Sequence, residues 1–328
     1  MSVNDIKASI IILSHNYLKE TTLPCLESIF LNSNSIDFEV IVIDNGSSDD
    51  TVNYLQNLKK QRDNLQCLYN KKNVGFAAGN NMGIRIARGN YLVLLNNDTI
   101  ITNGWLEKLI DPFVNNQNIG LVGPVTNSVG NEQIIYTNGE TVREIIDQGE
   151  MWCRRSEGRY FETGLLGFFC VAMRKELSEK IGLLDESFGL GFYEDDDFCY
   201  RVHKAGFKLI CLEDVFIYHR GSASFKYSDR KRIKKLLKEN KKRLEGNIGE
   251  KYSQSHPRDK ILKLVNKDIH ALKNDDVIND TLYRINNRIK LLDTLRPRGI
   301  IKRFLFDRKL NKARARLNDQ NFPLNRIE

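Results

Sequence analysis

Short runs of aliphatic and β-branched residues recur through the first 125 residues, and they constrain the fold more than any other feature of the chain. The runs are apolar at almost every position, and segments with a helical spacing of apolar residues separate them. Strands that are apolar on both faces are typical of a parallel sheet that helices cover on both sides. We therefore expect an α/β domain whose first strands are Ile10–Leu13, Phe38–Ile43, Leu65–Tyr69, Tyr91–Leu95 and Ile119–Val122.

Capping residues and spacing place the helices between these strands. Thr22 is expected to cap a helix with Pro24 in its first turn, and Asp49 or Asp50 is expected to cap the next one. Residues 126–163 lack a regular pattern and predict a loop-rich segment. The remaining expected elements are helices at Ala77–Ala87, Trp105–Val114 and Lys175–Ile181 and strands at Gly167–Met173, Phe207–Leu212 and Val215–Tyr218.

Charge divides the chain into two parts. Residues 226–328 contain 29 Lys and Arg against 13 Asp and Glu, whereas residues 1–225 contain 21 against 29. A change from acidic to basic composition marks a boundary, so we expect one domain at 1–225 and a basic helical region at 226–328. Within the second region, Ile300–Leu317 predicts a basic amphipathic helix.

The sequence favours a cytosolic protein. No apolar run approaches the roughly 20 residues that a membrane-spanning helix needs, and the apolar run near the N-terminus lacks the features of a secretory signal. None of the six cysteines forms a Cys-x-x-Cys pair, and most lie inside apolar stretches. Reduced, buried cysteines are therefore favoured over disulfides or zinc ligands.

Polar residues follow four of the expected strands. They lie at 14–16, 44–47, 70–73 and 96–98, where each strand ends. Each group alone is compatible with a turn or a helix cap. Ligands of parallel sheets bind at the carboxyl ends of the strands, so the four groups together predict one shared polar cleft.

Several residues at this cleft suit a nucleotide ligand. Asp44 can accept hydrogen bonds from a base imide or a ribose hydroxyl, and the Gly- and Ala-rich segment 73–81 allows close approach of amides to a ligand. That segment is neither the G-x-G-x-x-G fingerprint nor a P-loop, which disfavours a dehydrogenase or an ATPase. Asp98 can hold a divalent cation that also binds phosphate and water, with His219 as a candidate second ligand.

Four consecutive carboxylates, Glu194 to Asp197, lie between aromatic residues. Like charges at this spacing raise one another's pKa. Such a run fits a solvated helix start, since acidic residues suit a helix N-terminus. It equally fits a cluster in which one carboxylate acts as a base, and the residues of the run do not decide between the two.

These segments, in their order and spacing, resemble the family 2 glycosyltransferases, which are inverting nucleotide-sugar enzymes with the GT-A fold. The resemblance covers roughly residues 6–226. It rests on seven pieces of sequence: SIIILSHN, EVIVIDNGSSDDT, NVGFAAGNNMGI, YLVLLNNDT, GLLGFFCVAMRKE with IGLLDESF, FYEDDDFCYRVHKAGF and His219.

The resemblance implies a role for each matching residue. Asp195 would be the catalytic base, supported by Glu194, and Asp98 with His219 would bind Mg²⁺ or Mn²⁺. The first aspartate of the family's Asp-x-Asp motif is Asn96 here, so a lower metal affinity is expected. The residues implied to line the nucleotide site are Ser14, Asn16, Asp44, Asn73, Gly75, Asn80 and Asn97.

The implied activity is metal-dependent, inverting transfer of a sugar from a nucleotide-sugar donor to a hydroxyl acceptor. A UDP-sugar is favoured as the donor, and a dTDP-sugar such as dTDP-rhamnose comes next. The acceptor would be a glycan, a lipid-linked intermediate or a protein in bacterial surface glycan or glycoprotein synthesis. The alternative is a non-catalytic protein that binds a nucleotide-sugar or a glycan.

The basic region at 226–328 leaves several interpretations open. Its helices would contact the anionic inner face of the cell membrane, where lipid-linked acceptors lie, or would pack on the catalytic domain at 1–225 or form a homodimer contact. A nucleic-acid partner is not expected, because the region has little of the aromatic interleaving that single-strand binders use.

Overall fold

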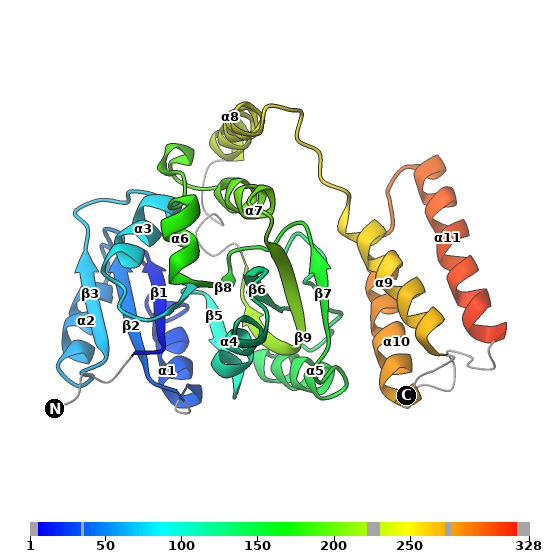
Figure 1. Cartoon of the computed structure of the whole chain (residues 1–328), viewed down its shortest axis with the longest axis horizontal. Helices are drawn as coiled ribbons and strands as arrows, with labels where there is room; N and C mark the ends of the chain where they lie inside the picture. Colours follow the sequence, from blue (N-terminus) through cyan, green and yellow to red (C-terminus); the bar gives the residue numbers. More distant parts are fainter. Residues whose placement is uncertain (1–5, 34–35, 222–229, 273–276, 320–328) are drawn as a thin grey trace.

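The computed structural model describes residues 6–33, 36–221, 230–272 and 277–319. Figure 1 shows a central sheet with helices on both faces and a group of helices beside it, formed by the C-terminal part of the chain. The strands are β1 (Ala8–Ser14), β2 (Phe38–Asp44), β3 (Leu65–Tyr69), β4 (Tyr91–Asn96), β5 (Thr99–Ile101), β6 (Ile119–Val125), β7 (Tyr160–Thr163), β8 (Cys170–Arg174) and β9 (Lys208–His219).

The helices lie between and after these strands. They are α1 (Thr22–Asn32), α2 (Thr51–Lys59), α3 (Phe76–Ile86), α4 (Trp105–Asn115), α5 (Val142–Arg154), α6 (Lys175–Ile181), the 3-10 helix η1 (Glu186–Phe188), α7 (Glu194–Lys204), α8 (Arg230–Ile248), α9 (Pro257–Ala271), α10 (Ile278–Thr294) and α11 (Ile300–Asp319).

The sheet is mixed but mostly parallel where the polar residues were expected. Its order is β3-β2-β1-β4-β8-β6-β9-β5, and β7 pairs with β9. β1 pairs in parallel with β2 and β4, and its register joins Ser14 to Asp44 and Leu13 to Asn96. The polar residues that end these strands therefore lie at one edge, as predicted. β8 runs antiparallel to its neighbours β4 and β6.

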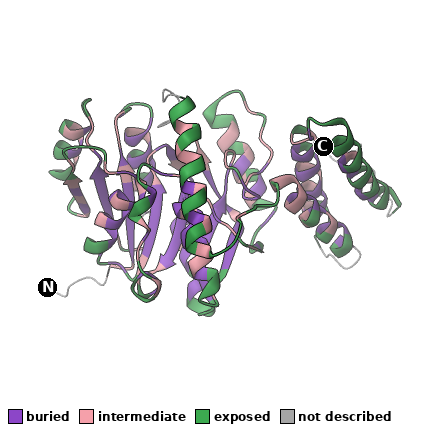
Figure 2. Ribbon diagram, turned by 90° about the horizontal axis from the view of Figure 1, so that it is seen from above, coloured by how far each residue is buried: buried purple, intermediate pink, exposed green. Residues whose placement is uncertain are grey.

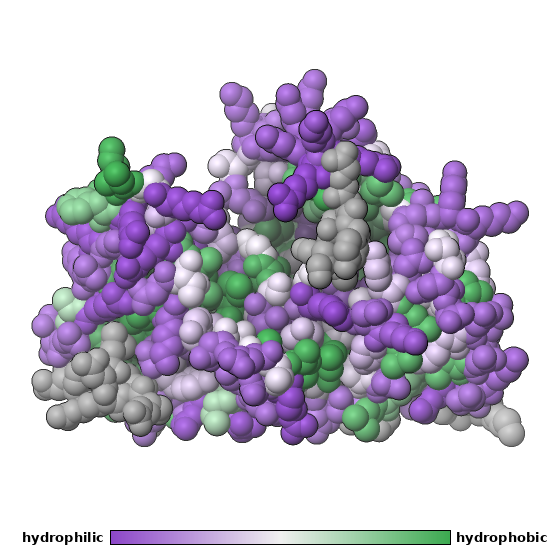
Figure 3. Space-filling view, turned by 180° about the vertical axis from the view of Figure 1, so that it is seen from behind, coloured by the Kyte–Doolittle hydropathy of each residue, from purple (hydrophilic) through white to green (hydrophobic). Residues whose placement is uncertain are grey.

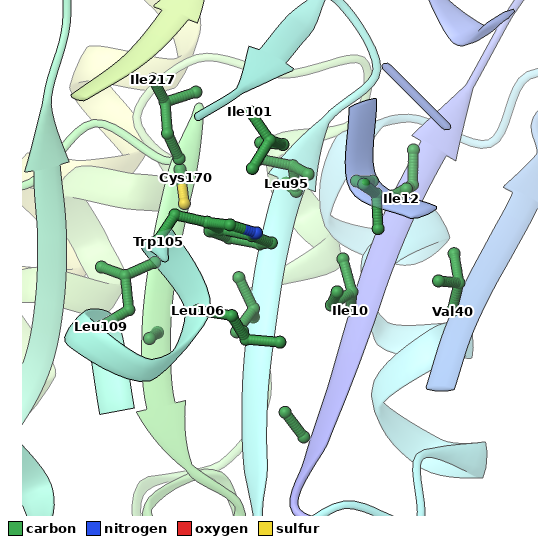
Figure 4. Close-up of a cluster of buried hydrophobic side chains, with 14 of the residues drawn as sticks. Ile10, Ile12, Val40, Leu95, Ile101, Trp105, Leu106, Leu109, Cys170 and Ile217 are labelled. Carbon is green, nitrogen blue, oxygen red and sulfur yellow. The ribbon is translucent and has the colours of Figure 1, made fainter. Parts of the chain in front are cut away.

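Burial explains why the central strands are apolar at almost every position. Ile10 and Ile12 pack with one side of the sheet's core, while Ile11 packs with the other. Figure 4 shows Trp105 of α4 lying among the aliphatic side chains of the first side. The indole Nε1 of Trp105 donates to the Ser33 hydroxyl at 2.9 Å, so its N–H is satisfied although the side chain is buried.

The segment 126–163 is more regular than its sequence suggested. It contains α5 and β7, which the sequence did not predict. The rest of the segment, at 126–141 and 155–159, has no helix or strand, as expected of a loop-rich segment. Thr141 and Glu144 form a capping box at the start of α5, in which each side chain bonds the other's backbone N–H. The Thr-x-x-Glu spacing was visible in the sequence and would have located this helix.

Smaller corrections concern element boundaries. The two strands expected at 207–212 and 215–218 are one strand, β9, and its pairing with β6 shifts register between Pro124 and Val125. β8 begins at Cys170, three residues later than predicted. Thr22 is the first residue of α1 rather than its cap.

The C-terminal helices α9, α10 and α11 share a hydrophobic cluster and also contact the body of the protein. The buried Arg288 of α10 forms ion pairs with Glu213 of β9 and with Asp268 of α9. Lys260 of α9 lies 2.7 Å from Glu132. Packing of this region on the α/β body, one of the interpretations left open by the sequence, is therefore what the structure shows.

Candidate functional site

The tips of β1 and β4 are joined to the start of α1 by hydroxyl and amide groups. The Ser14 hydroxyl lies 2.7 Å from the Thr22 hydroxyl, and both groups are buried. The Asn97 amide donates to the hydroxyls of Thr21 and Thr22, at 3.1 and 2.9 Å. Ser14 and Asn97, two of the expected nucleotide-site residues, thus lie at the predicted edge and hold α1 against it.

Asp44 at the end of β2 has one buried carboxylate oxygen without a hydrogen-bond partner among the described residues. Its Oδ2 accepts a hydrogen bond from the Ser47 backbone N–H at 3.2 Å. Its Oδ1 is buried and has no hydrogen-bond partner among the described residues. A buried oxygen of this kind costs free energy unless something donates to it, so the site suits a ligand that brings an N–H or O–H.

Asn16 ties the tip of β1 to the turn after β2. Its backbone N–H donates to the Ser47 hydroxyl at 2.8 Å, and its Oδ1 accepts from the Ser48 N–H at 2.7 Å. Asn16 also has a positive φ of 56°, which is uncommon outside glycine. The contacts hold this conformation and form one wall of the edge.

A buried residue that the sequence did not single out, Asn45, organises the neighbouring wall. Its Nδ2 donates to Asn73 Oδ1 at 3.0 Å, and its Oδ1 accepts from the Val74 N–H at 2.9 Å. Asn73 in turn accepts from the Gly75 N–H at 2.9 Å. Its position at the strand tip was the signal available in the sequence.

Gly75 lies at the start of α3 with a φ of 93°. A Cβ at this position would lie 1.9 Å from the carbonyl oxygen of Gly189, which belongs to the loop before α7. Glycine is therefore required here for close approach of that loop. Nearby on α3, the Asn80 amide is buried and donates to the Phe76 carbonyl of its own helix at 2.9 Å.

Asp98 and His219 are brought together by the pairing of β5 with β9. His219 Nε2 lies 3.2 Å from Asp98 Oδ1, and His219 Nδ1 lies 2.7 Å from the Ser128 carbonyl oxygen. The Phe169 ring stacks on the imidazole at a centroid distance of 5.2 Å. Burial lowers the pKa of His219, but the hydrogen bond and the charge of Asp98 outweigh burial and raise that pKa above its usual value.

The donor set of Asp98 and His219 fits a hard divalent cation. The Ser128 carbonyl accepts the Nδ1 proton, which leaves Nε2 as the ligand atom facing the carboxylate. Two protein ligands suffice for Mg²⁺ or Mn²⁺ when diphosphate and water complete the coordination. The described residues contain no group of three His, Cys, Asp or Glu side chains arranged for a metal, so phosphate oxygens would have to contribute.

The acidic run begins α7 but is not solvated. Glu194, Asp196 and Asp197 are buried, and Asp195 is partly exposed. Asp197 pairs with Arg201 one turn later at 2.8 Å. Burial, and then the charges of Asp196 and Glu194, raise the pKa of Asp195 well above its ordinary value. A carboxylate with a raised pKa is suited to accept a proton.

A surface hollow lies away from the polar edge. One cavity, of about 760 Å³, lies around the starting ends of β4 and β6, opposite the polar edge. Its most prominent cation, Arg174, is already engaged by backbone carbonyls, including that of Ile119 at 3.0 Å.

Burial raises the pKa of Glu194 to about 7, and its Oε2 has no hydrogen-bond partner among the described residues. A carboxyl with a raised folded-state pKa binds its proton more tightly when folded, so it lowers stability as pH rises from about 4.5 to about 7. We expect Glu194→Gln to raise the free energy of unfolding at pH 8 by up to about 3 kcal/mol and to change it little at pH 4.5. Urea denaturation at both pH values measures this, with the exposed Glu179→Gln as the matched control. Equal stability of variant and wild type at pH 8 would contradict it.

Comparison with known proteins is consistent with this geometry. Glycosyltransferase AglE of Haloferax volcanii is 28% identical over 183 residues, which cover 56% of this chain and 56% of that protein. The chain spans 25%, 35% and 38% of the length of three other curated relatives that it matches.

Two solved structures share the fold. GalNAc-T7 with UDP, GalNAc and Mn²⁺ has a TM-score of 0.54 at 15% identity and covers 76% of this chain and 57% of that one. S. aureus TarS 1–349 has a TM-score of 0.51 at 16% identity and covers 96% of this chain and 88% of that one. The expected GT-A fold is thereby confirmed. A family model described as glycosyl transferase family 2 matches residues 9–182, just over half of the sequence, and the chain belongs to that family.

Proposed function

We propose that this chain is an inverting, metal-dependent glycosyltransferase that moves a sugar from a nucleoside diphosphate sugar to a hydroxyl acceptor. The observation that carries the proposal is the position of Asp195 in the acidic run at the start of α7. The loop before it packs against Gly75, at the same edge that holds Asp44. Family membership supplies the reaction class.

The donor is held at the edge formed by β1, β2 and β4. Asp44 Oδ1, buried and without a protein partner among the described residues, accepts a hydrogen bond from the donor's base imide or ribose. UDP is favoured, with a dTDP-sugar such as dTDP-rhamnose second. Uracil and thymine present the same imide edge, so Asp44 does not discriminate between the two bases. The fold neighbour GalNAc-T7 was solved with UDP and Mn²⁺, which supports this choice.

Different residues of the chain have different roles in the reaction. Asp195 accepts the proton of the acceptor hydroxyl, whose oxygen forms a bond to the anomeric carbon as the bond from that carbon to phosphate breaks with inversion. Asp98 and His219 hold the metal ion. When bound, a divalent cation stabilises the charge that develops on the departing diphosphate. The acceptor is a glycan, a lipid-linked intermediate or a protein.

Replacing the base tests the mechanism. Asp195→Asn keeps the shape of the side chain but cannot accept the proton, so we expect kcat to fall by about 10²–10⁴-fold while UDP binding stays within about twofold. Sugar transfer and UDP affinity are measured side by side, with Asp147→Asn on the exposed face of α5 as the control. Equal transfer rates in variant and wild type would remove Asp195 from the role.

Asp98→Asn tests the metal site by binding alone. The substitution removes the negative charge beside His219, so we expect the affinity for Mn²⁺ in the presence of UDP to fall by at least about tenfold. Electron paramagnetic resonance of free Mn²⁺ measures this, and the exposed Asp50→Asn at the same sheet edge is the control. Unchanged affinity would rule out Asp98 as a ligand.

A second candidate function is binding of a nucleotide-sugar or glycan without catalysis. The observation that favours it is Asn96, an uncharged residue where the family motif has an acid. Metal-dependent release of UDP from a UDP-sugar, lost in Asp98→Asn, distinguishes the enzyme from the binding protein.

We also propose that the protein works in the cytoplasm, on the inner face of the membrane. No helix among the described residues is long and apolar enough to cross a membrane. At the start of α11, four large apolar side chains are exposed: Ile300 at 87%, Ile301 at 77%, Phe304 at 67% and Leu305 at 51%. Figure 3 shows hydrophobic atoms where this helix begins, among hydrophilic neighbours.

Basic residues beside the exposed apolar side chains of α11 also favour a membrane contact. Lys302, Arg303, Arg308 and Lys309 are exposed around the apolar side chains. Apolar groups flanked by cations suit the interface of a membrane with anionic lipids. A homodimer contact through the same surface is the competing arrangement.

Vesicle sedimentation distinguishes these arrangements. We expect wild type to sediment with phosphatidylglycerol vesicles but not with phosphatidylcholine ones. Changing Ile300, Ile301 and Phe304 together to Ser should reduce binding by at least about tenfold, because each side chain contributes about 1.5–3 kcal/mol when buried. Leu31→Ser with Val114→Ser, exposed on the α/β body, is the control. Wild type that stays in the supernatant with both lipids would exclude the membrane contact, and a dimer that dissociates in the triple variant would replace it.

A further inference from the structure

Helix α8 lies beside the acidic run, although it belongs to the basic part of the chain. Figure 2, the view from above, shows α8 crossing over the sheet with its outer side exposed. Its buried residues are Asn240 and Leu244. A buried amide needs polar partners, because leaving it unpaired costs free energy.

The Asn240 amide finds these partners in the loop that precedes α7. Its Nδ2 donates to the carbonyl oxygens of Phe188 and Gly191, both at 2.8 Å, and to that of Phe192 at 3.2 Å. The side chain of one residue thus bonds three backbone groups within five positions of the chain.

The 188–193 loop, residues Phe188 to Tyr193, has an unusual backbone. Gly189 and Gly191 have positive φ values of 67° and 141°, and Phe192 and Tyr193 have 73° and 74°. Residues other than glycine keep such values only where their surroundings hold them. On the side away from α8, the Gly189 carbonyl packs against Gly75, so the loop is held between α3 and α8.

Residues of α8 and of the segment after it also donate hydrogen bonds directly to carboxylates of the acidic run. Asn247 donates to the carboxylates of Asp185 and Asp197, at 3.1 and 3.0 Å. Beyond the end of α8, the Tyr252 hydroxyl and the Gln254 amide both donate to Oδ1 of Asp196. These four residues, Asn240, Asn247, Tyr252 and Gln254, are called the α8 clamp below.

We propose that the α8 clamp is part of the catalytic centre. Asn240 positions the 188–193 loop and so sets the place of Asp195, while Tyr252 and Gln254 hold the neighbouring Asp196 in its charged form. The proposal rests on the role of Asp195 as the base and deepens it. The clamp residues are positioning residues, which act on the acceptor through Asp195.

The hydrogen bonds of Tyr252 and Gln254 also change the electrostatic environment of the acidic run. Several titratable or charged groups lie near Asp195 and Asp196. They are Glu194, Asp197 with its ion-pair partner Arg201, Tyr193, Cys199 and Tyr252; Glu245 lies near Tyr193. Burial raises the pKa of Asp196, but the hydrogen bonds of Tyr252 and Gln254 oppose that rise. Negative charge is therefore favoured on Asp196, and a proton shared within the run stays on Asp195 to a higher pH.

The first test removes the donors of Asn240. Asn240→Leu is similar in size and cannot bond the loop, so we expect kcat to fall between about tenfold and a hundredfold, as for a misplaced catalytic group, while the donor KM stays within about twofold. Asn311→Leu, the same exchange at an exposed position of α11, is the control and should match wild type. A folded Asn240→Leu variant with wild-type kcat overturns the positioning role.

The second test reads the charge and remains decisive if Asn240→Leu does not fold. Tyr252→Phe combined with Gln254→Leu removes both donors to Asp196, so Asp195 becomes ionised at a lower pH. Activity needs ionised Asp195, so the acidic limb of the pH profile of kcat/KM should move down by about one unit. A packing defect alone would lower the rate without moving this limb. A limb that stays in place or moves up overturns the charge effect.

The two proposals fail in different ways. If Asp195→Asn transfers sugar as fast as wild type, the proposed base is wrong and the clamp inference is overturned with it. If Asp195→Asn is inactive while both clamp variants behave as wild type, the proposed function stands and only the clamp is rejected.

Discussion

Four adjacent carboxylates cannot all be buried and charged without compensation, and the arrangement around α7 follows from that constraint. The cost of burying its charge is offset differently for each carboxylate. Asp197 is paired with Arg201 and Asn247, and Asp196 accepts two hydrogen bonds from Tyr252 and Gln254. Glu194 has no partner for Oε2 among the described residues, and burial raises its pKa to about 7. Asp195 lies between two carboxylates, and burial together with these neighbours raises its pKa, which suits a base.

The parts of the site that were predictable from the sequence are those that depend on strand position. Parallel strands end at one edge, so the polar groups at Ser14, Asp44 and Asn96 had to meet there. The neighbourhood of Asp98 and His219 followed from the resemblance and was found in the pairing of β5 with β9. The role of Asn45 was missed because an Asn in a turn has a sufficient local explanation as a turn residue.

What lay beyond sequence reasoning depends on contacts between distant segments. Gly75 looked like a residue that approaches a ligand, but its Cβ position is filled by Gly189, more than 100 residues away. Asn240 lies in a helix whose composition indicates only a basic, exposed surface, and its three carbonyl partners are about 50 residues earlier. No periodicity or capping rule connects such segments, because the loop conformation that joins them is itself a product of the packing.

The charge division of the chain has a related explanation. An acidic body and a basic C-terminal region suggested two separate units, yet opposite charges also suit an interface. Arg288 is buried between Glu213 and Asp268, and Lys260 pairs with the buried Glu132. Removing one member of such a pair leaves a buried charge uncompensated, so the two parts depend on each other.

The candidate functional site also depends on residues from the C-terminal region. The family match ends at residue 182, so it contains the residues proposed to bind the donor, up to Asp98, and stops before the acidic run and His219. The proposed acceptor side is formed by later residues, which include contacts from α8 and from the segment up to Gln254. The proposed donor site is thus the part that the family match covers. The environment of Asp195 is built by residues that follow the matched segment, and differences in acceptor between relatives are expected to be found there.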